Sequence, residues 1–272
     1  MLRALEVRIL ICTDFALASI LGKCCQGEIL ASLVGRNAMK SLIVKFGTKS
    51  LMSQKGILDS ATFDEIARQI ALLMSDDWQV VIVTSGAIQA GCEEAKSVNV
   101  LLDDLHKKDI AALGSPRLMQ MWAGAFRKQG RCVGQIWLTH SNLQNQGEQR
   151  SIGQSIRNLV RSGIVPVLNE NDVISDREIQ TMDAGISEND RLTFLLCAIV
   201  NPSYVLSITS TGGVFDRFPC TEQAKMYLEL DTKNLPLDLT ESEEKSTVGT
   251  GGMFRKIIEL SKCCEQGCRV GI

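Results

Sequence analysis

The sequence predicts an α/β protein whose mainly parallel central sheet is covered by helices on both faces. Short apolar runs such as Val80–Val83 alternate with segments of helical periodicity, which is typical of a parallel sheet. The runs are apolar at nearly every position, as in strands buried on both faces. Polar residues directly follow several runs, and open α/β sheets bind ligands at these carboxyl ends. We therefore expect a binding site along one edge of the sheet.

The apolar runs are the expected strands. They cover residues 41–44, 80–83, 132–138, 164–168 and 204–208, and a last strand begins at 269. Val, Ile and Leu dominate these runs, and such residues suit buried, pleated positions. The exit loops of the first two strands begin at Lys45 and Thr84.

Helical periodicity predicts helices between the strands. The first helix begins near Asp59 or Ser60, either of which can cap it, and places Phe63 and Ile66 on one face. A second helix is expected to open at Ser115-Pro116, because proline is favoured in a first turn. Further helices are expected over 151–161 and 189–200, and from 249–252 through about 264. Residues 173–186 are predicted to form a hairpin or a loop, and residues 216–247 a flexible excursion.

Composition excludes several classes of protein. The chain has 272 residues, is 45% hydrophobic and carries a net charge of −2, which suits one large or two small domains without nucleic acid or an acidic membrane as partner. No apolar run reaches the roughly 20 residues that span a bilayer. We interpret residues 1–40 as an extension of unknown role and residues 41–272 as the main domain.

Ten cysteines occur, none of them in a CxxC pair. This pattern favours a reduced, cytoplasmic protein in which free cysteine acts as a small buried hydrophobe. A zinc site at Cys263, Cys264 and Cys268 stays open, but no metal ligand is assigned.

Glycine-containing loops carry the first part of the expected chemistry. Lys45 and Gly47 combine a cation with a backbone that an anion can approach closely. Ser85-Gly86-Ala87 offers a hydroxyl and helix N–H groups that suit a carboxylate or phosphate. A third glycine turn, 250–253, is followed one turn later by Lys256. Each loop alone also fits a solvated lysine or an ordinary turn, and neither GxxxxGK[ST] nor GxGxxG is present.

Acidic and amide residues make up the second part of the expected binding site. Asn169 and Asp172 follow the strand 164–168, and Asn189-Asp190 open a helix. As an N-cap, Asn189-Asp190 needs no other role. These carboxylates would repel phosphate, but they could orient lysines, hold a metal or accept an ammonium group.

Five segments in order make a resemblance specific: VKFGTKSL (44–51), VIVTSGAIQAG (81–91), GIVPVLNENDVI (163–174), SENDRL (187–192) and GTGGMFRK (249–256). From about residue 41 onward, the chain resembles the glutamate 5-kinases of the amino acid kinase family. The resemblance implies a three-layer α/β/α sandwich. It also implies that the C-terminal part is incomplete and that an RNA-binding-type (PUA) domain is missing.

The resemblance implies ATP-dependent phosphorylation of the side-chain carboxylate of L-glutamate to L-glutamyl 5-phosphate, with Mg²⁺, as the first step towards proline. The implied catalytic residues are Lys45, Lys256 and Asp190. Glutamate would be bound by Ser85, Gly86, Ala87, Asn169, Asp172 and Asn189. The nucleotide would be bound by Lys45, Gly47, Thr209, Ser210, Gly249, Thr250, Gly251, Gly252, Met253 and Lys256.

Two departures from the family pattern keep alternatives open. Ser187-Glu188 stands where the family has Gly-Asp, and Ser210 stands where the family has Asp. One alternative is a catalytically silent homologue that binds a nucleotide or amino acid. Another is a relative that acts on a different acid or a nucleoside monophosphate. A homo-oligomer is expected, feedback inhibition by proline is left open, and no nucleic acid or membrane partner is expected.

Overall fold

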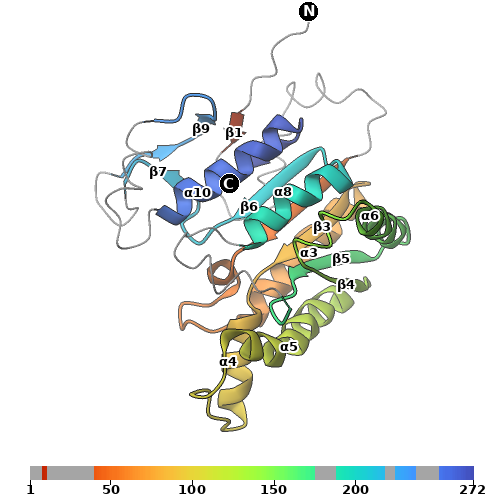
Figure 1. Ribbon diagram of the computed structural model, residues 1–272, viewed down its shortest axis with the longest axis vertical. Helices are drawn as coiled ribbons and strands as arrows, with labels where there is room; N and C mark the ends of the chain where they lie inside the picture. The colour runs from red at the N-terminus through yellow and green to blue at the C-terminus, as the bar shows by residue number, and fades with distance from the viewer. Residues whose placement is uncertain (1–7, 11–39, 175–187, 218–223, 237–250) are drawn as a thin grey trace, which may run out of the picture.

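Within the part of the chain that the structure describes, the main sheet has eight strands, with helices on both faces (Figure 1). The computed structural model describes residues 8–10, 40–174, 188–217, 224–236 and 251–272. The strands are β1 (Arg8–Leu10), β2 (Ser41–Phe46), β3 (Gln79–Thr84), β4 (Val133–Leu138), β5 (Val165–Glu170), β6 (Tyr204–Ile208), β9 (Glu229–Asp231) and β10 (Arg269–Gly271). Their order is β4-β5-β3-β2-β6-β10-β1-β9, parallel except for the antiparallel β1–β9 pair. The predicted fold class is confirmed.

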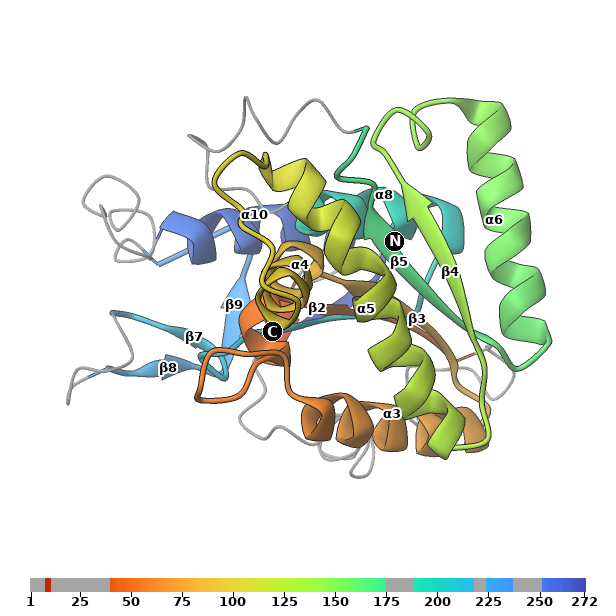
Figure 2. The same ribbon diagram turned by 90° about the horizontal axis from the view of Figure 1, so that it is seen from below.

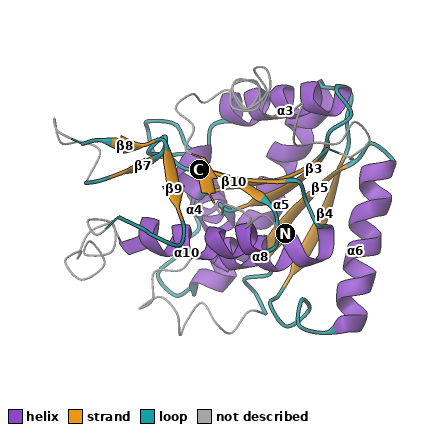
Figure 3. Cartoon of the chain, turned by 90° about the horizontal axis from the view of Figure 1, so that it is seen from above, coloured by secondary structure: helices purple, strands orange, loops and turns teal. Residues whose placement is uncertain are grey.

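The helices form two layers. They are α3 (Ser60–Ser75), α4 (Ala87–Ser97), α5 (Lys107–Lys128), α6 (Gln146–Arg161), α8 (Glu188–Val200) and α10 (Gly251–Glu265), with a short 3-10 turn η1 (Thr48–Leu51). One hydrophobic cluster joins α3, α4 and α5 to one face of the sheet, and a second joins α6, α8 and α10 to the other. Figures 2 and 3 show α3 and α10 on opposite sides of the sheet. A separate ribbon pairs β7 (Val214–Phe215) with β8 (Met226–Tyr227).

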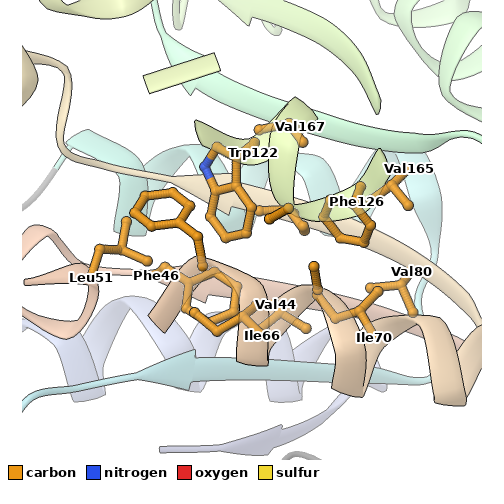
Figure 4. Packing of buried hydrophobic residues seen from close by; sticks show 14 of the residues in the cluster. Val44, Phe46, Leu51, Ile66, Ile70, Val80, Trp122, Phe126, Val165 and Val167 are labelled. Atoms are coloured by element: carbon orange, nitrogen blue, oxygen red, sulfur yellow. The ribbon is translucent and has the colours of Figure 1, made fainter. Parts of the chain in front are cut away.

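Successive side chains of β2 point to opposite faces of the sheet, and this alternation connects the hydrophobic core to the site. Val44 and Phe46 face the α3–α5 layer, so Lys45 between them points to the α8–α10 layer. Phe46 is held by Trp122, whose ring centroid lies 5.6 Å away, in an aromatic cluster with Phe126 (Figure 4). Because Phe46 is fixed in the core, the direction of its neighbour Lys45 is fixed as well.

Several elements differ from the expectations in their bounds. β2 extends to Phe46, so Lys45 lies in the strand rather than in its exit loop. The helix expected to open at Pro116 begins at Lys107, because Ile110 and Ala111 continue its buried stripe and Asp109 caps its start. The helix expected over 151–161 begins at Gln146. Residues 8–10, assigned to the extension, form a strand of the main sheet; residues 1–7 and 11–39 lie outside the described residues.

Helices α4 and α5 cross at two glycines. A Cβ atom placed on Gly114 would lie 2.0 Å from the carbonyl oxygen of Ala87 and 2.1 Å from the backbone nitrogen of Gly91. Distances this short exclude any side chain. Since Ala87 opens α4 directly after the Ser85-Gly86 loop, this crossing also determines where that loop lies.

Replacing Gly114 by alanine is expected to destabilise the protein by about 1–3 kcal/mol, because the helices must separate to admit one methyl group. Gly124→Ala, in the same helix, is the matched control, since a Cβ there meets no described atom within 4 Å. Chemical denaturation of both variants measures the difference. Equal stability of the two variants would contradict the close crossing.

Candidate active site

The carboxyl ends of the parallel strands bring the predicted residues to one edge of the sheet. Lys45 lies near the end of β2, Ser85 directly follows β3, and Asn169 lies near the end of β5. Asp172 is half-buried in the turn after β5, and half-buried Thr209 follows β6. The helices α8 and α10 begin above this edge, as expected for an open α/β sheet.

A buried ion pair forms the centre of the site. Lys45 Nζ lies 2.7 Å from Asp190 Oδ1, and the two side chains are 3% and 5% exposed. A buried lysine is tolerated because the carboxylate compensates its charge. Strand β2 supplies the cation and the first turn of α8 supplies the anion, so the pair links the sheet to the helix layer.

A second lysine adjoins this pair from the far end of the chain. The pKa of Lys256, in α10, is lowered to about 8, first by burial and then by the charge of Lys45, whereas Asp190 opposes the shift. The residue as a whole is half-buried, but its amine lies in enclosed surroundings. Lys45, Asp190 and Lys256 therefore form one electrostatic cluster, and their catalytic role stays a prediction.

Asn189 connects three of the expected amino-acid-binding elements. Its Nδ2 donates to Ser85 Oγ at 2.9 Å and to Asn169 Oδ1 at 3.0 Å. Its Oδ1 accepts from the backbone N–H of Glu170 at 3.3 Å. The start of α8 is thereby tied to the ends of β3 and β5. Predicted residues separated by about 100 positions in the sequence thus form one polar network.

Two glycines leave room beside these polar groups. A Cβ on Gly47 would lie 4.0 Å from Lys45 Nζ, so a side chain there would cover the amine. Gly86 adopts φ 115° as the N-cap of α4, a conformation that favours glycine. Gly86 has no side chain to cap α4, so the first-turn N–H groups can face an anion.

The structure describes only some of the expected nucleotide-binding residues. Gly251, Gly252 and Met253 form the first turn of α10, followed within one turn by Lys256. Thr209 Oγ1 lies 3.2 Å from Thr211 Oγ1, and Ser210 is exposed. Gly249 and Thr250 lie outside the described residues, so their role stays a prediction.

Sequence reasoning assigned no role to a second buried pair. His140 Nε2 lies 3.9 Å from Glu170 Oε2, and both side chains are almost fully buried. Glu170 is also the residue whose backbone N–H donates to Asn189. His140 follows strand β4 as Ser85 follows β3, so its position after an apolar run could have indicated a place at this edge.

The fold and this cluster agree with the comparison of the sequence with known families. The model of the amino acid kinase family matches residues 40–272. The chain belongs to the amino acid kinase family.

Within that family, the chain is similar to glutamate 5-kinases. It is 30% identical to the glutamate 5-kinase of Symbiobacterium thermophilum, over 84% of this chain and 85% of that protein. It is 32% identical to the enzyme of Syntrophus aciditrophicus, over 82% of this chain but 57% of that protein. The chain thus spans little more than half the length of some of the curated relatives it matches.

Solved structures support the fold alone. UMP kinase from Ureaplasma parvum superposes with a TM-score of 0.52 at 13% identity, covering 85% of this chain and 88% of that one. Carbamate kinase from Giardia lamblia, solved with AMP-PNP, gives 0.55 at 11% identity, covering 86% and 92%. Among the described helices, none combines the length and hydropathy needed to cross a membrane.

Proposed function

We propose that this protein transfers the γ-phosphoryl group of ATP to the side-chain carboxylate of L-glutamate, giving L-glutamyl 5-phosphate. The observation that carries the proposal is the cluster of Lys45, Asp190 and Lys256. Two amines from opposite ends of the chain meet around one carboxylate. A silent binding protein would have no need to bury two cations together.

The cluster suits phosphoryl transfer to a carboxylate. The acceptor is already ionised, so the reaction needs alignment and positive charge rather than a strong general base. Lys45 and Lys256 would stabilise the charge on the oxygens of the transferring group. Asp190 would hold Lys45 in place through the 2.7 Å contact, and its charge opposes the lowering of the Lys256 pKa.

Mg²⁺ would neutralise charge on the nucleotide phosphates. Asp190 is already engaged by Lys45, which fits a metal held mainly by nucleotide oxygens and water. The first-turn N–H groups of α10, beside Gly251 and Gly252, would suit the phosphates.

The polar network around Asn189 would hold the amino acid. Ser85, Asn169 and Asn189 already fix one another, so their hydrogen-bonding groups are preorganised. Asp172, three residues after Asn169, would accept the α-ammonium group. The resemblance adds further expectations: a cytoplasmic homo-oligomer in proline synthesis, with proline as a candidate inhibitor.

ADP release from ATP and Mg²⁺ tests the proposal directly. We expect glutamate to support release far better than aspartate or UMP, and Lys256→Ala to abolish most of it. ADP release that is no faster with glutamate than without an acceptor would overturn the proposal.

Asp172→Asn is expected to raise the KM for glutamate at least about tenfold, because a charge-assisted hydrogen bond contributes roughly 1.5–3 kcal/mol. The KM for ATP should change little. Initial rates at varied glutamate and varied ATP separate the two effects. An unchanged KM for glutamate would remove Asp172 from the site.

We expect kcat/KM to fall as the pH rises through about 8, which is the lowered pKa of Lys256. A lysine is charged below its pKa, so the transferring group loses one cation above it. In Lys256→Arg the residual activity should lack this fall, since a guanidinium stays charged. A profile still flat well above pH 8 would show that a charged Lys256 is not required.

A further inference from the structure

A buried histidine and a buried glutamate lie beside the polar network, and the proposed function assigns no role to either side chain. His140 Nε2 lies 3.9 Å from Glu170 Oε2, and the two side chains are 3% and 1% exposed. His140 follows β4, and Glu170 ends β5, the neighbouring strand. A buried carboxylate is costly without compensation, and a protonated imidazole at this distance supplies it. The two side chains therefore stabilise each other.

The pair lies on the side of the sheet that carries α8. Leu168 packs in the hydrophobic cluster of the α6, α8 and α10 layer. Glu170, two residues later on the same strand, points to the same face, because side chains alternate along a strand. Asn189, in the first turn of α8, belongs to this layer too. The Glu170 carboxylate and the start of α8 are thus on one side of β5.

The backbone of Glu170 connects the pair to the polar network. Its N–H donates to Asn189 Oδ1 at 3.3 Å, and Asn189 Nδ2 donates to Asn169 Oδ1 at 3.0 Å. The following N–H, that of Asn171, donates to the carbonyl of Leu138 in β4 at 2.7 Å. A displacement of Glu170 would therefore move the hydrogen-bonding groups of Asn189 and Asn169.

The turn that carries His140 is itself held by hydrogen bonds. The backbone N–H and Oγ1 of Thr139 both donate to Asn142 Oδ1, at 2.7 and 2.9 Å. The N–H of Leu143 donates to the carbonyl of His140 at 3.1 Å. Asn145 then caps α6, which runs beside β4 (Figures 2 and 3). Because the turn is fixed on both sides of His140, the imidazole is a fixed support for the Glu170 carboxylate.

We propose that His140 and Glu170 are positioning residues of the amino-acid site. His140 holds the Glu170 carboxylate, so that the Glu170 N–H stays directed at Asn189 and the end of β5 keeps Asn169 in place. In this role neither side chain needs to touch the substrate. The inference rests on the proposed function and concerns glutamate rather than ATP, because the network joins residues expected to bind the amino acid.

Initial rates of ADP release at varied glutamate and at varied ATP test this role. We expect His140→Ala to raise the KM for glutamate at least about tenfold, because a misplacement of about 1 Å can cost two orders of magnitude. The KM for ATP should change less than about twofold, which general damage to the fold would not allow. His140→Gln, whose amide can still donate to the carboxylate, should recover part of the loss.

His106→Ala is the matched control. The chain has two histidines, and His106 is exposed at the start of α5. Its backbone N–H, which donates to Asp109, is kept in the variant. Both KM values should therefore stay at those of the parent.

A double variant distinguishes a pair from two independent contributions. Glu170→Gln should raise the KM for glutamate about as much as His140→Ala does, and it carries the test if His140→Ala fails to fold. Combining the two should raise the KM little further, because both substitutions break the same contact. The inference is wrong if the two effects multiply, if the KM for ATP rises equally, or if His140→Gln gives no recovery.

The parent enzyme separates this inference from the proposed function. If the parent releases ADP in response to glutamate but the KM for glutamate is unchanged in His140→Ala and Glu170→Gln, the positioning role is refuted and the proposed function stands. If the parent shows no glutamate-dependent release, the proposed function is refuted, and this inference with it.

Discussion

Replacing Lys256 by alanine is expected to lower kcat at least about 100-fold while both KM values change much less. The charge on the transferring group changes most in the transition state, so its neighbouring cation should act mainly there. The position supports this expectation, because the amine is enclosed beside Lys45 and Asp190. Steady-state ADP release at saturating ATP and glutamate measures the loss.

Lys262→Ala is the matched control on the same helix. Lys262 pairs with the buried carboxylate of Glu259 at 2.5 Å, and its own side chain is 39% exposed, so its removal should lower stability but leave kcat nearly unchanged. Lys256→Arg should restore little activity, because a planar guanidinium does not replace a compact ammonium. A Lys256→Ala enzyme with kcat within about threefold of the parent would show that Lys256 is not a catalytic residue.

Replacing Asp190 by asparagine should have an effect of similar size. The variant leaves Lys45 and Lys256 together without the carboxylate that now attracts both. Removing one partner of a buried ion pair costs about 3–5 kcal/mol, and two uncompensated amines repel each other. We expect kcat to fall at least about 100-fold, because Lys45 loses its orientation and the pKa of Lys256 falls further without Asp190.

The pH profile distinguishes lost charge from general damage. Asp190 raises the pKa of Lys256, so Asp190→Asn should shift the alkaline fall in kcat/KM below pH 8. Asp64→Asn, which breaks an exposed pair with Lys128, should leave profile and rate unchanged. If kcat/KM of Asp190→Asn falls at the same alkaline pH as in the parent enzyme, Asp190 does not raise the pKa of Lys256.

The sequence predicted the layers and the edge of the site well, because both depend on local patterns. Apolar runs identified β3, β5 and β6, and the polar residues after them placed Ser85 and Asn169 at one edge. The resemblance selected Lys45, Asp190 and Lys256, and the structure brings all three together. The pattern of apolar and polar residues alone could not distinguish these two lysines from ordinary solvated lysines.

Features that depend on distant contacts could not be predicted. The close approach of Gly91 and Gly114 needs the path of two helices, which periodicity does not contain. Strand β1 has only three residues and gains its partners from β9 and β10. The pairing of His140 with Glu170 follows from the register of β4 on β5, where Leu138 faces Glu170.

The position of β2 in the middle of the sheet sets an order on folding. β2 pairs on one side with β3 and on the other with β6, and Ser41 meets Ser203 across 162 residues. Until β6 arrives, the backbone N–H and C=O groups along one edge of β2 stay unpaired, and closing so long a loop slows the step. During synthesis from the N-terminus, the strand that carries Lys45 is therefore made long before its partner β6, and this edge is open to non-native strand pairing until β6 follows.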